Sequence, residues 1–205
     1  MPEWLTPDAR SAGWIMIVAG AGLALHIVRH LFHREPAVAS FFSPKGGCAA
    51  AVVAEVNAAR REVLVMAYSF TCPDIVAALI AAARRRVRVV ILLDRSNETE
   101  TYSELGDLER HKMEVWIDAS HAIAHNKVIV IDGRVVVTGS FNFTRQAEHE
   151  NAENLLILRD HPGLAARYRE NFHAHKGHCH APGARQPAKP PHIHDRGHAH
   201  SHRVA

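Results

Sequence analysis

The stretch VIVIDGRVVV, residues 128–137, decides the fold, because two apolar runs surround a turn-forming pair. The runs Val128–Ile131 and Val135–Val137 are β-branched throughout, as strands favour. Asp132 and Gly133 stand between them, and Asp-Gly is a strong signal for a tight hairpin turn. We therefore predict two neighbouring strands joined by this turn.

Polar residues surround the hairpin with the spacing H-x-K-x4-D-x6-G-S-x-N, and they are His125, Lys127, Asp132, Gly139, Ser140 and Asn142. Side chains alternate between the faces of a strand, so His125 and Lys127 point the same way, roughly 7 Å apart. A histidine beside a fixed positive charge suits an anionic substrate, and phosphate is the obvious one.

This spacing resembles the HKD signature of the phospholipase D superfamily at every defining position. The resemblance continues in GSFNFT (Gly139–Thr144), in Glu153 of AENLLIL, in FSPKGG (Phe42–Gly47) and in VLVMAYSFT (Val63–Thr71). These segments are most similar to the small bacterial Nuc-type endonucleases and more distantly to the mitochondrial phospholipase D-like protein. The resemblance covers roughly residues 41–175 and implies an α/β fold with a mixed central sheet flanked by helices.

Phosphodiester cleavage needs a nucleophile, stabilisation of charge on the phosphate oxygens, and an acid for the leaving group. His125 can attack phosphorus and form a phosphohistidine, which water then hydrolyses. Lys127 and Asn142 are candidates to bind the phosphate oxygens. Ser140 and the amides near Gly139 can add hydrogen bonds to the substrate, and the alternative for Ser140 is that it simply caps the turn.

Two carboxylates complete the candidate catalytic set. Glu153 can orient the imidazole of His125 and stabilise its protonated form, or it can be a surface charge at a strand edge. Asp132 belongs to the signature, but the resemblance gives it a mainly structural role. The resemblance also implies a metal-independent mechanism without a cofactor.

The chain contains one copy of the signature, whereas the reaction needs both a nucleophile and an acid. His121 and His149 lie nearby in the sequence but lack the lysine partner. We therefore expect a two-fold homodimer in which each subunit contributes His125, Lys127 and Asn142 to a shared site.

Residues 1–11 are polar, and residues 12–32 form an apolar segment that ends among basic residues. We predict an uncleaved membrane anchor there. A signal segment removed on export to the periplasm and a buried core helix stay open as alternatives.

The remaining chain predicts one domain after a linker over residues 33–43, with a β-α-β unit and a final helix over His161–Phe172. The 205 residues are 47% hydrophobic with a net charge of +3, which tolerates a nucleic-acid or anionic lipid partner.

Residues 177–205 are rich in proline, glycine, alanine and histidine and predict a disordered tail. Within it, His178, Cys179 and His180 are candidates for adventitious binding of Zn²⁺ or Ni²⁺. We place no metal in the active site. The three cysteines lack the spacing of a disulfide framework.

The leading functional prediction is a non-specific endonuclease that acts on nucleic acid. The alternative is phospholipase D-type hydrolysis of phosphatidylcholine or cardiolipin, because the same residues would catalyse both reactions. A membrane-tethered nucleic-acid or metal-binding protein without turnover is the third hypothesis, and the intact signature argues against it.

Overall fold

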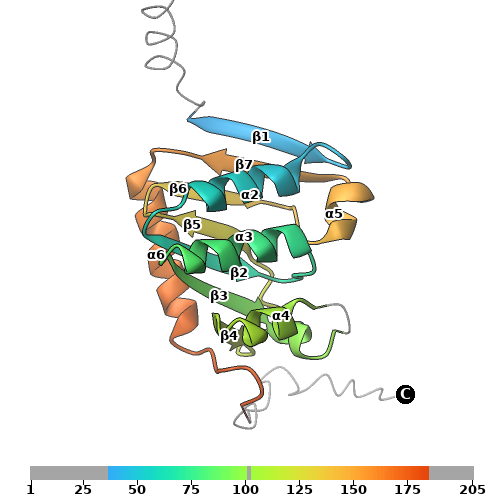
Figure 1. The fold of residues 1–205 in the computed structure, drawn as a ribbon, viewed down its shortest axis with the longest axis vertical. Helices are drawn as coiled ribbons and strands as arrows, with labels where there is room; N and C mark the ends of the chain where they lie inside the picture. The colour runs from blue at the N-terminus through green and yellow to red at the C-terminus, as the bar shows by residue number, and fades with distance from the viewer. Residues whose placement is uncertain (1–36, 101–102, 185–205) are drawn as a thin grey trace, which may run out of the picture. The chain divides into compact units, whose positions relative to one another are not determined.

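The computed structural model describes residues 37–100 and 103–184. Their strands form one sheet in the order β1-β7-β6-β5-β2-β3-β4 (Figure 1). The bounds are β1 Val38–Ser43, β2 Glu62–Ala67, β3 Arg88–Asp94, β4 Glu114–Asp118, β5 Lys127–Ile131, β6 Val135–Gly139 and β7 Glu153–Leu158.

The sheet is mixed, as predicted. Strands β2, β3 and β4 run parallel, whereas β5 pairs antiparallel with β2, β6 with β5, and β7 with β6. The parallel pair β2 and β3 is joined through α3 (Pro73–Arg84), which confirms the predicted β-α-β unit. Because β5 and β7 run in the opposite direction to β2 and β6, the first residues of β5 and β7 lie at the same edge of the sheet as the last residues of β2 and β6.

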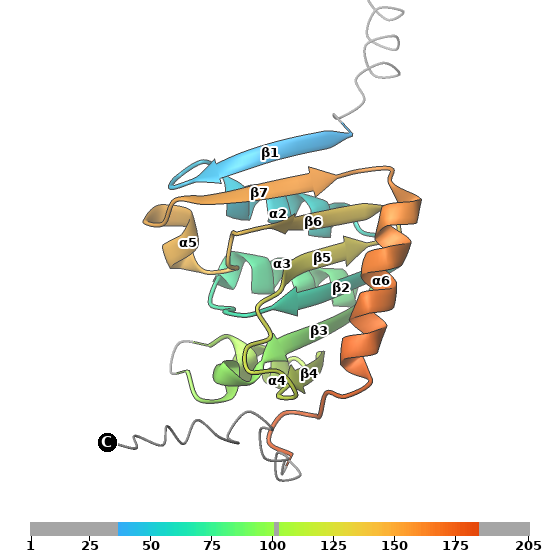
Figure 2. The ribbon, with the colours of Figure 1, turned by 180° about the vertical axis from the view of Figure 1, so that it is seen from behind.

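Helices cover both faces of the sheet. On one face α2 (Cys48–Ala58) and α3 pack over the larger apolar core, as Figure 1 shows. On the other, α6 (Pro162–Lys176) crosses the strands and buries Ala165 and Phe172 (Figure 2). The short elements are η2 (Arg95–Glu98), α4 (Leu105–Arg110) and α5 (Arg145–His149).

The predicted hairpin turn is confirmed, with φ values of 53° at Asp132 and 66° at Gly133. The carboxylate of Asp132 accepts hydrogen bonds from the backbone N–H groups of Arg60, Arg61 and Glu62, at 3.0, 2.7 and 2.9 Å. Burial opposes ionisation of Asp132, but these three donors outweigh it and lower the pKa of the carboxyl group. The hydrogen bonds of Asp132 therefore hold the connection between α2 and β2 against the hairpin turn.

Both ends of the domain differ from the expectation. The linker prediction is wrong for Val38–Ser43, which form the edge strand β1 beside β7. The predicted tail is ordered in its first part, since Ile117 and His180 exchange backbone hydrogen bonds of 2.8 and 3.0 Å.

The rest of the tail and the predicted anchor over residues 12–32 lie outside the described residues. No helix within the described ranges is long and apolar enough to cross a membrane.

Candidate active site

Most of the residues predicted for the site lie together at one edge of the sheet, where the ends of four strands meet. The ends of β2, β5, β6 and β7 that meet there carry Tyr68, His125, Lys127, Gly139, Ser140, Asn142 and Glu153. Asp132 follows the last residue of β5, at the opposite edge, roughly 16 Å from Lys127 by the strand rise. Asp132 therefore does not share a site with the other residues.

His125 is exposed on the loop that leads into β5. Its ring lies 4.7 Å from the ring of Tyr68, measured between centroids. The loop is held on both sides of the histidine, because Ala124 N donates to Asp94 Oδ2 at 2.7 Å and Tyr68 N donates to Asn126 O at 3.0 Å. The imidazole is thus accessible to substrate while its backbone is fixed.

Lys127 is the buried cation of the site, with 8% of its surface exposed. Its Nζ lies 5.2 Å from the ring centroid of Tyr68, which is cation–π distance. Burial lowers the pKa of Lys127, and the negative charge of Glu153 partly offsets that effect. Tyr68 was not predicted as a site residue. The sequence feature that could have identified Tyr68 is an aromatic side chain directly after a buried strand.

Glycine is required at position 139, because a Cβ there would lie 2.3 Å from the carbonyl oxygen of Asn154. Ser140 Oγ accepts hydrogen bonds from Asn154 N at 3.0 Å and Asn154 Nδ2 at 3.3 Å. The hydroxyl of Ser140 therefore fixes the β6–β7 connection, the capping role that the sequence left open.

Asn142 is half-buried, and its Oδ1 has no hydrogen-bond partner among the described residues. An unsatisfied amide is costly unless a ligand or water completes it. Half a turn about the last side-chain bond presents the NH₂ group instead, which can donate to a phosphate oxygen. Asn142 is therefore suited to hold an anionic ligand.

Glu153 accepts a hydrogen bond from Asn151 Nδ2 at 3.2 Å. Within the part of the chain that the structure describes, it makes no hydrogen bond to His125, although its charge acts on Lys127. Inside one subunit Glu153 is therefore bonded to Asn151, and its negative charge raises the pKa of Lys127.

The candidate metal ligands of the tail do not converge. Cys179 Sγ donates to His175 O, and His180 Nδ1 lies 2.9 Å from Ala181 O. Burial, with a smaller contribution from Asp118, raises the pKa of Cys179 to about 12, which keeps its thiol protonated. Of the three candidates His178 alone joins a group of ligand-type side chains, and its partners lie elsewhere in the chain.

The structure brings together at one sheet edge an accessible imidazole, a buried ammonium and an unsatisfied amide, the groups that a site for phosphate esters needs. The chain belongs to the phospholipase D-like family: the model described as "Cardiolipin synthase, PLD-like domain" matches residues 52–176. It is accordingly a phosphodiesterase, and the family chemistry requires no cofactor.

Curated relatives agree with this assignment. "Phospholipase D" of Rickettsia bellii is 45% identical over 139 residues, covering 68% of this chain and 69% of the relative. "Mitochondrial cardiolipin hydrolase" of Xenopus tropicalis is 35% identical over 114 residues, or 56% of this chain and 54% of that protein.

Solved structures show the same fold. The phospholipase D family member Nuc from Salmonella typhimurium superposes with a TM-score of 0.68 at 35% identity, covering 71% of this chain and 97% of Nuc. NucT from Helicobacter pylori gives a TM-score of 0.64 at 25% identity, over 69% and 96% of the two chains.

Proposed function

We propose that this phosphodiesterase is a non-specific endonuclease. The observation that carries the proposal is a cavity of about 690 Å³ beside the site, lined by Thr71, Pro73, Glu104, Arg145, Gln146, His149 and Glu150. The carbonyl oxygen of Phe143, which follows Asn142, accepts hydrogen bonds from the backbone N–H groups of Thr71 and Cys72, so the lining residue Thr71 is bonded to the residue next to Asn142. Arg145, Gln146 and His149 in this lining can donate hydrogen bonds to a sugar-phosphate backbone, beside the acidic side chains of Glu104 and Glu150.

In this proposal His125 attacks phosphorus, the bond to the leaving oxygen breaks, and a phosphohistidine forms. Lys127 and Asn142 stabilise the non-bridging oxygens. Glu153 partly offsets the lowering of the Lys127 pKa by burial, and Ser140 holds Asn142 in place through the β6–β7 connection. Water then hydrolyses the phosphohistidine and regenerates the free imidazole.

The acid for the leaving oxygen comes from His125 of a second copy, in a two-fold homodimer. The exposed ring of His125 supports this proposal, because it leaves room for a symmetry mate at the same edge. Sedimentation tests the assembly directly. A fully active monomer would overturn it.

The second candidate is hydrolysis of phospholipid, and two observations favour it. The Rickettsia relatives are named phospholipase D, and Ile123, two residues before His125, is 55% exposed. An apolar side chain at that position can enter a lipid surface. Anchoring through residues 12–32, which we propose from the sequence, would hold the site near such a surface.

A paired assay separates the two candidates. Plasmid nicking in EDTA is measured beside hydrolysis of phosphatidylcholine and cardiolipin vesicles, with His125→Asn as the inactive variant and exposed His161→Asn as its control. The endonuclease proposal predicts that Arg145→Ala weakens DNA binding and lowers its salt slope by about 1, whereas Ile123→Ser changes neither. Vesicle hydrolysis that Ile123→Ser abolishes, without nicking, would establish the lipid activity instead.

A further inference from the structure

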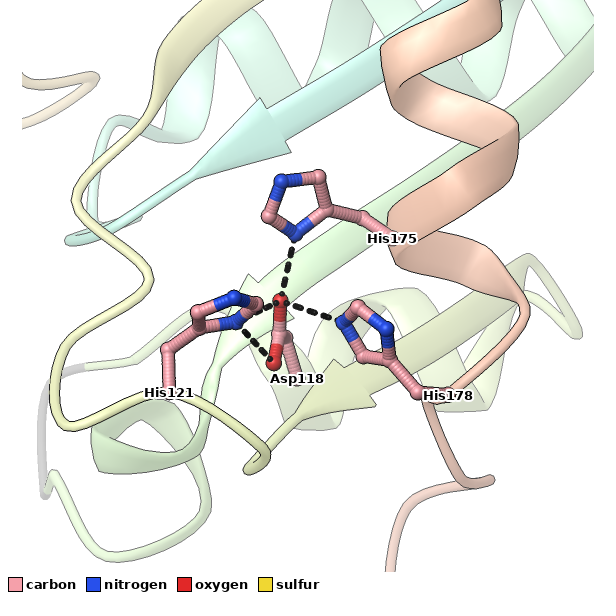
Figure 3. Close-up of side chains that lie close together, drawn as sticks. All are labelled: Asp118, His121, His175 and His178. Atoms are coloured by element: carbon pink, nitrogen blue, oxygen red, sulfur yellow. Dashed lines mark hydrogen bonds and ion pairs between the residues drawn. The ribbon is translucent and has the colours of Figure 1, made fainter.

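Three histidines surround one buried carboxylate, which lies at the end of β4, the outermost strand on one side of the sheet. Figure 3 shows the rings of His121, His175 and His178 converging on Asp118, which is 2% exposed. Nδ1 of His175 and Nε2 of His178 lie 2.9 and 3.3 Å from Asp118 Oδ2, and Nδ1 of His121 lies 3.1 Å from both carboxylate oxygens. We call these four residues the β4 cluster.

The spacing of the β4 cluster matches a tetrahedral metal site. All four ligand atoms lie within 4.8 Å of one another. Zinc–nitrogen and zinc–oxygen bonds of about 2.0–2.1 Å separate the ligands of a tetrahedral ion by about 3.3 Å. The contacts between the histidine nitrogens and the carboxylate are 2.9–3.3 Å, close to that length, so side-chain rotations that bring the more distant ligand atoms together would admit an ion.

The backbone positions these ligands from two directions. Asp118 ends β4 and His121 follows in the next loop, while His175 lies in the last turn of α6 and His178 just beyond it. Pairing of His180 with Ile117 returns the chain to β4 and keeps this second pair beside the first. The side chains of His121 and His178 are 45% and 37% exposed, which leaves an entry path for an ion from solvent.

Ordinary charge pairing explains the β4 cluster less fully. Burial raises the pKa of Asp118, but hydrogen bonds from His175, His121 and His178 outweigh it and lower the pKa to about 2, so the group is a carboxylate. Asp118 Oδ1 also accepts a hydrogen bond from the backbone N–H of Ser120 at 3.1 Å, so the carboxylate has a donor besides the three histidines. Three imidazoles with one carboxylate form the nitrogen-rich donor set that transition metals prefer.

We propose that the β4 cluster binds one Zn²⁺ ion through three histidine nitrogens and a carboxylate oxygen of Asp118. The ion joins the end of α6 to the edge strand β4 and fixes the start of the loop that carries His125. Strands β2 and β3 separate β4 from β5, so the ion lies outside the phosphate site and takes no part in phosphoryl transfer.

The test is metal stoichiometry of the full-length protein. Histidines of the predicted tail can also attract metals, so the reference protein carries the substitutions His192→Ser, His194→Ser, His198→Ser, His200→Ser and His202→Ser. Stripped of metal and titrated with Zn²⁺ against a chromogenic chelator, it should bind one equivalent per chain tightly. His121→Ala and His175→Ala should each weaken that equivalent by about 100-fold or more, since even indirect partners of a metal change affinity by 10–100-fold.

His173→Ala is the matched control, because His173 is exposed on the same helix and lies outside the β4 cluster. The His173→Ala variant should still bind one equivalent of Zn²⁺ tightly. Co²⁺ added to the unmutated protein should give the intense visible absorption of a tetrahedral complex, and Zn²⁺ should raise the Tm. These two readouts need no variant to fold.

Three results would overturn the proposal. They are no tight equivalent in the reference protein, an equivalent that survives His121→Ala and His175→Ala, or an octahedral Co²⁺ spectrum with an unchanged Tm. Each would show that the β4 cluster is held by hydrogen bonds alone.

Discussion

Replacing Asp132 by alanine should lower stability without removing catalytic power. The carboxylate accepts three backbone N–H groups, and a hydrogen bond to a charged group contributes about 1.5–3 kcal/mol net. The donors of Arg60 and Arg61 are exposed and regain water after the substitution, so we expect a loss of about 2 kcal/mol from the hydrogen bonds.

Asp160→Ala is the matched control, because Asp160 has φ 59° and Asp132 has φ 53°. Both substitutions therefore carry the same left-handed backbone strain for alanine. Asp160 forms an exposed ion pair with Arg134, which contributes little. The difference between the two variants isolates the carboxylate–backbone hydrogen bonds.

Thermal unfolding followed by circular dichroism should place the Tm of Asp132→Ala about 4–8 °C below that of Asp160→Ala. Below both transitions the two variants should cleave substrate with the same kcat. Equal Tm values, or a folded Asp132→Ala protein with a greatly reduced kcat, would refute the structural role.

Three further predictions concern the same hairpin and site. In acid the difference in unfolding free energy between the unmutated protein and Asp132→Asn should disappear. The ionised carboxylate stabilises the fold fully above its ordinary pKa of 3.8, and this stabilisation is lost as the pH falls through its lower folded pKa. Urea unfolding at a series of pH values measures the difference. Glu153→Gln removes the charge that raises the pKa of Lys127, so the alkaline limb of the pH–rate profile should move to lower pH, and an unmoved limb would contradict the pairing. Gly139→Ala forces a Cβ within 2.3 Å of the Asn154 carbonyl oxygen and should destabilise by roughly 1–3 kcal/mol in chemical denaturation; Gly163→Ala, where a Cβ meets nothing within 4 Å, is its control.

The local sequence predicted the fold well wherever one side chain pattern had a single interpretation. The hairpin, the buried parallel strands and the final helix all follow from short-range periodicity and turn chemistry. Strand β1 was missed because an edge strand needs no continuous apolar run, and VASFFS alternates exposed and partly buried residues. Its pairing with β7 joins segments far apart in the sequence, which no local pattern reveals.

The site was predictable as far as the signature reached. The spacing brought His125, Lys127 and Asn142 to one edge, but it could not show that Ser140 bonds to Asn154 or that Glu153 acts on Lys127. The β4 cluster was missed because it combines Asp118-x2-His121 with the distant pair His175-x2-His178. Its second pair crosses the boundary of the predicted tail, so the composition predicts His178 only as an adventitious ligand beside Cys179 and His180.

The most direct test of the catalytic account is rapid-quench trapping of the covalent intermediate, using a phosphodiester substrate labelled on phosphorus. We predict an acid-labile label on His125, located by peptide mass spectrometry, with one label for every two chains because the partner histidine acts as the acid. His125→Asn should show neither label nor turnover. A label on another residue, or turnover by His125→Asn, would contradict the central claim.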